Sequence, residues 1–217
     1  MVPILIKIKI MTTAMAGWSA AAAPTPMPAQ AIAMVVNAEV AAPVSVSFYD
    51  ENDHQTGTIA IWRDGAVDDA TKAVVKKLFR CRKTLRQKMM AQQTLAMLAD
   101  VSDHYPGKVI EYVSAYRTGG AESSTSPHRA GTALDFRIRG VQLRDIRDYL
   151  WKTYNDVGVG WYPEEQFVHI DTRPQIHDTA WTFIKGNNHY HPYWAESATR
   201  EQATGIAVAP HLHRAGS

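Results

Sequence analysis

Residue types suited to metal chemistry are concentrated in the second half of the chain, where expected strands meet loops. His128 ends a loop rich in Gly and Ser, Asp135 lies on the next strand, and His169 and Asp171 lie on a later strand. Alternate residues of a strand share one face, so His169 and Asp171 point the same way, about 7 Å apart along the strand. Catalytic zinc sites take three ligands from His, Asp and Glu and leave a fourth position to water. His128 and Asp135 supply two ligands of this kind, and His169 on the later strand could supply the third. Spacing alone does not establish that the three converge, and an isolated histidine is commonly structural.

The composition limits which sites and partners are open to the chain. Its 217 residues are 46% hydrophobic and 20% charged, which is typical of a globular domain and excludes a wholly disordered chain. The formal net charge is +2, with 23 Lys and Arg against 21 Asp and Glu, so nothing favours a nucleic-acid partner. The single cysteine, Cys81, excludes an internal disulfide and every multi-cysteine zinc site. Any metal must therefore be held by His, Asp or Glu.

The apolar pattern predicts an α+β fold in which helices pack on an antiparallel sheet. Alternation over 44–50 and 56–62 predicts a hairpin, and helical spacing predicts helices over 68–85 and about 86–104. A stripe of Met and Leu on the second helix is interpreted as core. The further expected elements are strands over 108–117 and 131–139, a helix over 143–154, and a hairpin over 157–163 and 166–173.

Both ends of the chain are expected to lie outside this domain, which we place at 44–180. Residues 1–33 combine a basic patch, an uncharged stretch and a run of small residues, which is typical of a secretory signal, and 34–43 reads as a linker. A disordered leader or a misassigned start is the alternative. No later stretch has the roughly 18 apolar residues of a membrane span. We therefore expect an exported protein, periplasmic or associated with the cell wall, with no stable membrane span after signal cleavage.

The C-terminal part, 181–217, has little periodicity and is predicted to be an irregular tail. It contains two His-x-His pairs that look like metal sites on paper. In an irregular segment we expect them to be solvated. They are His189 with His191, and His211 with His213.

Three segments, taken together and in this order, resemble a known family. They read SAYRTGG (114–120), SPHRAGTALDF (126–136) and VGVGWYPEEQFVHIDTR (157–173). They are similar to the signature segments of the LAS zinc peptidases, the group of lysostaphin, D-Ala-D-Ala peptidases and hedgehog-like folds. The murein endopeptidase K branch is the most similar, and the resemblance runs from about Val44 to Arg173.

The resemblance implies roles for individual residues. His128, Asp135 and His169 match the three zinc ligands of the family. Arg117 matches an arginine suited to hold a substrate carboxylate or carbonyl, although a structural salt bridge is the alternative. Asp171 is interpreted as a functional residue, either orienting a ligand imidazole or acting as a base.

The chain departs from the family where a general base is expected. Some relatives have Glu three residues before the last ligand, where this chain has Gln166, and others have His two residues before it, where this chain has Phe167. Glu165 and His177 remain as candidates beside Asp171, so the base is not assigned.

The expected function is an exported zinc metallopeptidase that hydrolyses amide bonds in peptidoglycan stem peptides, with cross-links as the targets. Two alternatives stay open. One is a D,D- or L,D-carboxypeptidase or dipeptidase, in which Arg117 grips a free carboxylate. The other is a non-catalytic, zinc-containing cell-wall-binding domain, which the missing base favours. The oligomeric state is not predicted.

Overall fold

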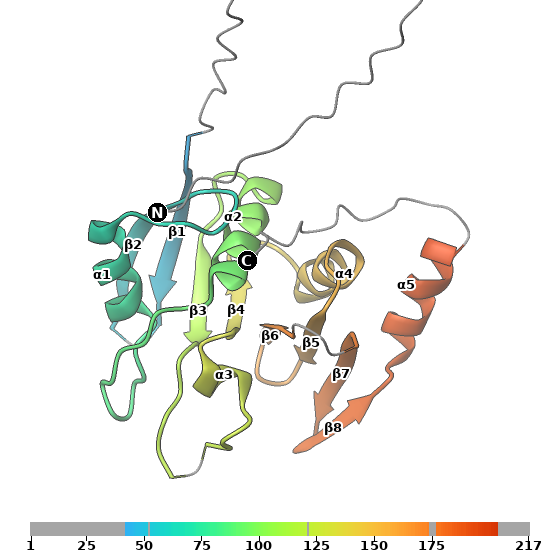
Figure 1. Cartoon of the computed structure of the whole chain (residues 1–217). Helices are drawn as coiled ribbons and strands as arrows, with labels where there is room; N and C mark the ends of the chain where they lie inside the picture. The colour runs from blue at the N-terminus through green and yellow to red at the C-terminus, as the bar shows by residue number, and fades with distance from the viewer. Residues whose placement is uncertain (1–41, 52, 121, 174–176, 204–217) are drawn as a thin grey trace, which may run out of the picture. The chain divides into compact units, whose positions relative to one another are not determined.

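The computed structural model describes residues 42–203 except 52, 121 and 174–176, and it has the expected α+β class (Figure 1). The expected leader, 1–33, lies outside the described residues, as does most of the expected linker, 34–43. In chain order the elements are β1 (Val44–Asp50), β2 (Gln55–Ile61), α1 (Asp69–Leu78), α2 (Gln92–His104), β3 (Ile110–Ser114), α3 (Pro127–Ala130), β4 (Ala133–Ile138), α4 (Leu143–Thr153), β5 (Val157–Tyr162), β6 (Phe167–Thr172), β7 (Thr179–Ile184), β8 (Asn187–Tyr190) and α5 (Tyr193–Ala203).

The strands form one sheet in the order β2-β1-β3-β4-β6-β5-β7-β8. The pairings are antiparallel except for β1 with β3 and β5 with β7, which are parallel. The sheet is therefore mixed, whereas the sequence suggested a purely antiparallel one. In both parallel pairs the two strands are not consecutive in the chain: β3 pairs with β1, and β7 pairs with β5.

The apolar core lies between the sheet and helices α2 and α4. Leu95 and Leu98 of α2 and Ile146 and Leu150 of α4 are at most 1% exposed and belong to one cluster with apolar strand residues. Burying each such side chain contributes roughly 1.5–3 kcal/mol. The predicted Met and Leu stripe is thus core. In the central strands, apolar residues alternate with His, Asp or Gly, which leaves the opposite face of β4, β5 and β6 available for a site.

The two helices expected over 68–104 are both shorter than predicted. Helix α1 begins after Asp68, whose side chain accepts a hydrogen bond from Thr71 N at 2.6 Å, and it ends at Leu78. The segment 79–91 is not helical because its backbone bonds elsewhere. Phe79 O accepts from Tyr116 N at 3.2 Å, and Ala91 N donates to Gly131 O at 2.8 Å. These bonds tie the segment to the chain around the later His128.

The expected irregular tail is wrong for its first part. Strands β7 and β8 extend the sheet, and α5 packs beside α4 (Figure 1). Trp181 on β7 is 6% exposed. His189 and His191 are exposed, as expected, and His211 and His213 lie outside the described residues. Among the described residues, no helix has both the length and the apolar character needed to cross a membrane.

Candidate metal centre

The central strands place the candidate residues in one row across the sheet. Asp135 on β4 pairs with His169 on β6, His169 pairs with Gly160 on β5, and Gly160 pairs with Trp181 on β7. Neighbouring strands lie about 4.8 Å apart, and paired residues share a face. The register therefore brings Asp135 and His169 together on the face opposite the core.

His128 reaches this row from the short helix α3. Its neighbour Pro127 opens the helix, and Gly131 closes it with φ 81°, a left-handed conformation that suits glycine. A Cβ on Gly131 would also lie 3.0 Å from Met89 O. The glycine thus allows the tight turn that directs His128 toward β4 and β6.

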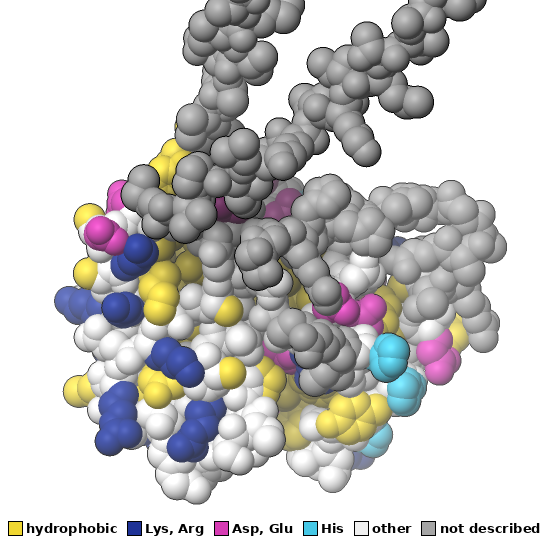
Figure 2. Space-filling view, viewed as in Figure 1, with side chains coloured by type: hydrophobic (Ala, Val, Ile, Leu, Met, Phe, Trp, Pro, Cys, Tyr) yellow, Lys and Arg dark blue, Asp and Glu magenta, His cyan; other side chains and the backbone are white. Residues whose placement is uncertain are grey.

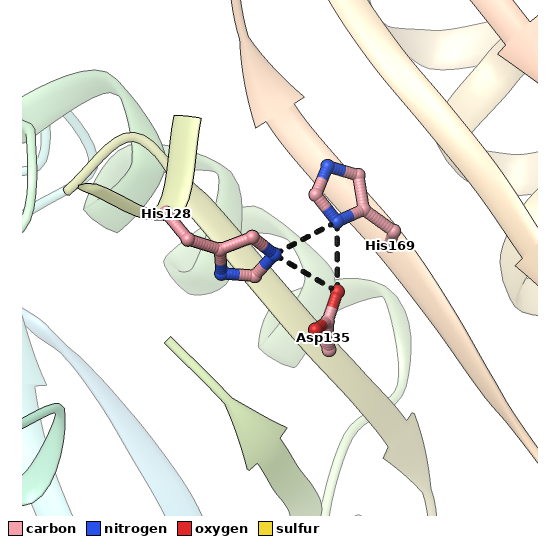
Figure 3. A group of neighbouring side chains, drawn as sticks. All are labelled: His128, Asp135 and His169. Atoms are coloured by element: carbon pink, nitrogen blue, oxygen red, sulfur yellow. Dashed lines mark hydrogen bonds and ion pairs between the residues drawn. The ribbon is translucent and has the colours of Figure 1, made fainter. Parts of the chain in front are cut away.

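The three side chains converge, which spacing alone had left open (Figure 3). His128 Nε2 lies 3.2 Å from His169 Nδ1 and 3.3 Å from Asp135 Oδ1, and His169 Nδ1 lies 2.7 Å from Asp135 Oδ1. All three residues are buried, with exposed fractions of 1% to 5%. Within the described residues, this is the group of His, Cys, Asp and Glu close enough to hold a metal ion.

Hydrogen bonds on the far side of each ring direct the imidazole nitrogens inward. His128 Nδ1 lies 2.6 Å from Ala115 O, and a carbonyl accepts, so Nδ1 donates and Nε2 faces the cluster. His169 Nε2 donates to Asp171 Oδ2 at 2.9 Å, so Nδ1 faces the cluster. Such partners fix the tautomer and orientation of metal-ligating histidines in proteins.

The electrostatics of the cluster favour a cation at its centre. Burial alone would lower the pKa of His169, but its hydrogen bonds to the carboxylates of Asp135 and Asp171 outweigh this effect and raise that pKa to about 9. Burial would also raise the pKa of Asp135, yet His128 and His169 hold it well below its usual range. The metal-free cluster therefore keeps a positive charge on His169 between two carboxylates.

This donor set fits zinc. In a tetrahedral site with bonds of about 2.0–2.1 Å, ligand atoms lie about 3.3 Å apart. The three candidate ligand atoms form a triangle, and two of its edges match that separation. They join His128 Nε2 to His169 Nδ1, at 3.2 Å, and to Asp135 Oδ1, at 3.3 Å. The third, between His169 and Asp135, has the length of a hydrogen bond, 2.7 Å. Exchanging the shared proton for a metal ion requires that one edge to open by about half an ångström.

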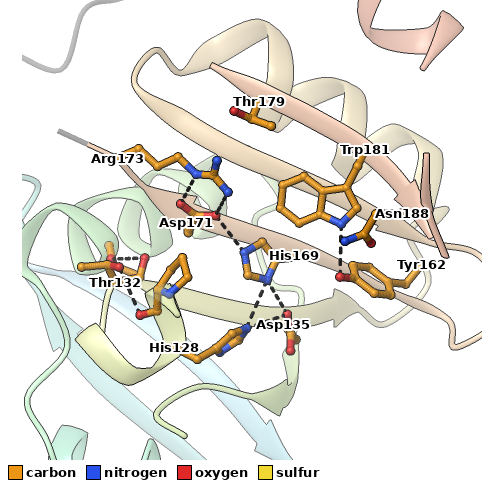
Figure 4. A network of polar contacts seen from close by, with 12 residues as sticks. His128, Thr132, Asp135, Tyr162, His169, Asp171, Arg173, Thr179, Trp181 and Asn188 are labelled. Atoms are coloured by element: carbon orange, nitrogen blue, oxygen red, sulfur yellow. Dashed lines mark hydrogen bonds and ion pairs between the residues drawn. The ribbon is translucent and has the colours of Figure 1, made fainter. Parts of the chain in front are cut away.

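Asp171 is held in a network that leaves it no contact with the centre of the cluster (Figure 4). Its carboxylate is fully buried and accepts from His169 Nε2 and from Arg173, at 2.6 Å from Nε and 3.0 Å from Nη2. Burial would raise its pKa, but these hydrogen bonds lower it. Because it contacts the ring edge facing away from Asp135, the geometry suits Asp171 to positioning His169.

Arg117 lies at the edge of the cluster. Its Nη1 is 3.7 Å from Asp135 Oδ2, and its Nε is 3.3 Å from Glu122 Oε2. The side chain as a whole is 43% exposed, but its Nε atom is buried and forms no hydrogen bond with the described residues. Arg117 thus forms the ion pairs of a structural salt bridge, and its side chain is also partly exposed.

The two positions at which the resemblance leads us to expect a base do not offer one. Gln166 is exposed in the β5–β6 turn with φ 61°, and its side chain bonds to Pro163 O. Phe167 stacks on Tyr162 with ring centroids 4.4 Å apart. Glu165 and His177 are exposed.

Two aromatic residues to which the sequence analysis assigned no role cover the site. The Trp181 ring lies 5.1 Å from that of His169, and Trp181 Nε1 donates to the Tyr162 hydroxyl at 3.1 Å. A Cβ on Gly160 would lie 2.5 Å from the Trp181 ring. The alternating glycines Gly158 and Gly160 were the available signal, because glycine inside a strand marks the close approach of another group.

Comparisons with known proteins agree on one family. The family model for peptidoglycan L,D-endopeptidase MepK matches residues 38–177, more than half of the chain. Peptidoglycan L,D-endopeptidase MepK of Escherichia coli (strain K12) is 35% identical over 80 residues, 32% of this chain and 43% of that protein. The probable peptidoglycan L,D-endopeptidase MepK of Haemophilus influenzae is 35% identical over 75 residues, 30% of this chain and 40% of that protein.

The chain thus aligns with less than half the length of these curated relatives. No solved structure gave a significant match. The family match ends at 177, before β7, so Trp181 lies beyond it.

Proposed function

Because the chain belongs to the peptidoglycan L,D-endopeptidase MepK family of peptidases, we propose that it is a zinc metallopeptidase that hydrolyses amide bonds in peptidoglycan stem peptides. We propose cross-links as the targets and the periplasm or cell wall as the compartment. The observation that carries the proposal is the convergence of His128 Nε2, Asp135 Oδ1 and His169 Nδ1 with distances of 2.7 Å to 3.3 Å.

In this proposal His128, Asp135 and His169 hold one zinc ion. Zinc bound there would lower the pKa of a coordinated water and polarise an amide carbonyl. Ala115 O and Asp171 hold the protons on the outer nitrogens of the two imidazoles, so that both rings keep a lone pair directed inward. Asp171 is thus a positioning residue rather than the base.

Arg117 is proposed to bind the substrate. Its Nη1 lies 3.7 Å from Asp135 Oδ2 and its side chain is partly exposed, so its donors can hold a carbonyl or carboxylate oxygen of a peptide at the cluster. Trp181 covers the His169 ring from the β7 side, which keeps water from that face of the ligand.

The test is digestion of purified, cross-linked muropeptide dimers by the zinc-loaded protein, with products identified by mass spectrometry. We expect dimers to be converted to monomers, His169→Ala to be inactive, and the exposed His177→Ala to remain active. Shortening of linear muropeptides with dimers left intact would instead support a carboxypeptidase or dipeptidase.

A second candidate, a non-catalytic zinc-containing domain that binds the cell wall, is favoured by Gln166 and Phe167 at the positions where relatives carry a base. It predicts retention of the zinc-loaded protein on insoluble peptidoglycan with no released product. Turnover of either muropeptide class would exclude it.

Export is proposed from the composition of residues 1–33. Cell fractionation, with mass spectrometry of the N-terminus of the exported protein, tests it. A protein found in the cytoplasm with an intact N-terminus would contradict it.

A further inference from the structure

A cavity of about 650 Å³ opens beside the candidate metal centre. One wall is the segment after α1, with Arg82, Lys83 and Thr84. The opposite wall is the end of β3 and the chain that follows it, with Ser114, Tyr116 and Arg117. The cluster of His128, Asp135 and His169 does not line this cavity. What the cavity can bind must therefore be argued from its own lining residues.

The cavity and the cluster share a wall. Ala115 accepts the hydrogen bond of His128 Nδ1, while its neighbours Ser114 and Tyr116 line the cavity. Arg117 lines the cavity as well, and its Nη1 lies 3.7 Å from Asp135. A peptide whose reacting amide lies at the cluster can therefore extend past Arg117 into the cavity.

The cavity carries uncompensated positive charge. Its cations are Arg82, Lys83 and Arg117, and its one lining carboxylate, Glu122, lies 3.3 Å from Arg117. Arg82 donates to the carbonyl of Val113 at 3.0 Å, and no described carboxylate forms an ion pair with Arg82 or Lys83. Figure 2 shows Lys and Arg side chains gathered over α1 and the segment that follows it.

The other large cavity, of about 680 Å³, differs in this respect. Its arginines Arg137 and Arg139 are paired with Glu111, at 2.8 Å and 2.5 Å, and its third arginine, Arg144, is paired with Asp145 at 3.6 Å. Their charge is already compensated within the protein. The cavity lined by Arg82 and Lys83 should therefore attract an external anion more strongly than the other cavity does.

We propose that this cavity is a subsite for a free carboxylate of the peptide that is cleaved at the cluster, with Arg82 and Lys83 as the residues that recognise it. The inference rests on the proposed function, which supplies the peptide. Stem peptides carry free carboxyl groups, and the arginine fork matches a carboxylate. Arg82 and Lys83 thus select peptides that carry a negative charge on the side that enters the cavity.

The experiment compares two probes by isothermal titration calorimetry at low salt on chelator-treated protein, so that binding is measured without cleavage. One probe is a stem tetrapeptide with free carboxyl groups, and the other is the same peptide with every carboxyl converted to a carboxamide. The variants are Arg82→Gln and Lys83→Gln together, with Lys76→Gln, an exposed lysine of α1 outside the cavity, as the matched control.

Wild type and Lys76→Gln are expected to bind the acid about tenfold more tightly than the amide, and the double variant to lose most of that preference. Equal binding of the two probes by wild type, absence of binding by both, or an unchanged preference in the double variant would overturn the subsite. Selective binding by a protein that never cleaves muropeptides would refute the proposed function and leave the subsite standing.

Discussion

The hydrogen bond between Asp171 and His169 allows a quantitative prediction for Asp171→Asn. The carboxylate accepts from His169 Nε2 at 2.9 Å and from Arg173 at 2.6 Å and 3.0 Å. An amide of the same shape has one oxygen, so its NH₂ group must face a donor of either His169 or Arg173. The variant therefore loses at least one charge-assisted hydrogen bond in a fully buried position.

Hydrogen bonds to charged groups contribute about 1.5–3 kcal/mol. Without this hydrogen bond the His169 ring is held less firmly in the orientation that binds zinc. Removing such a partner of a metal ligand commonly lowers metal affinity about 10- to 100-fold. We expect the Kd for zinc to rise by that factor in Asp171→Asn. Competition against a chromophoric chelator near neutral pH measures it.

Asp100→Asn is the matched control. Asp100 is a partly buried carboxylate in a different network, where it accepts from Tyr149 at 2.6 Å and from Tyr154 at 2.5 Å, and it does not contact the cluster. Its loss should lower the stability of the fold and leave the zinc affinity unchanged. An unchanged Kd in Asp171→Asn, or an equal rise in both variants, would refute the positioning role of Asp171.

Three further predictions concern the aromatic cover and the metal. Gly160→Ala should lower the free energy of unfolding in urea by roughly 1–3 kcal/mol, because its Cβ would meet the Trp181 ring at 2.5 Å, whereas Gly57→Ala, with open space around its Cβ, should change it far less. Tyr162→Phe should cost about 1–3 kcal/mol in the same assay, since Trp181 Nε1 loses its acceptor; an unchanged midpoint would contradict the contact. Chelation should lower the Tm of wild type, because zinc at 100 times its Kd stabilises the folded state by about 2.7 kcal/mol. In His169→Ala, chelation should leave the Tm unchanged.

The sequence was sufficient to predict the central strands and the face they share. Periodicity placed β1, β4, α4 and the β5–β6 hairpin within two residues of their observed bounds. In these segments the apolar alternation is set by burial on one face, which is a local and readable signal. The α+β class followed from it.

The sequence could not predict what depends on distant contacts. The segment 79–91 has a helical pattern but bonds to residues near Tyr116 and Gly131 instead. Strand β7 has a short pattern, and it lies in the sheet through its pairing with β5 and with β8. Tertiary pairing overrides local propensity in both places.

The convergence of the candidate site likewise depends on register. The pairing of Asp135 with His169 and the Gly131 turn behind His128 determine whether three separated residues meet. Neither can be computed from spacing along the chain. The role of Asp171 also needed the structure, since its choice between base and positioning residue depends on which ring nitrogen it contacts.

Zinc stoichiometry tests the central claim most directly. Elemental analysis of the purified full chain after gel filtration, beside His128→Ala, Asp135→Ala, His169→Ala and His177→Ala, is the measurement. We predict one zinc per chain in wild type and His177→Ala, and loss of that zinc in each of the other three. Zinc retained in those three variants, or a wild type that binds none, would contradict the ligand assignment and the proposed hydrolysis with it.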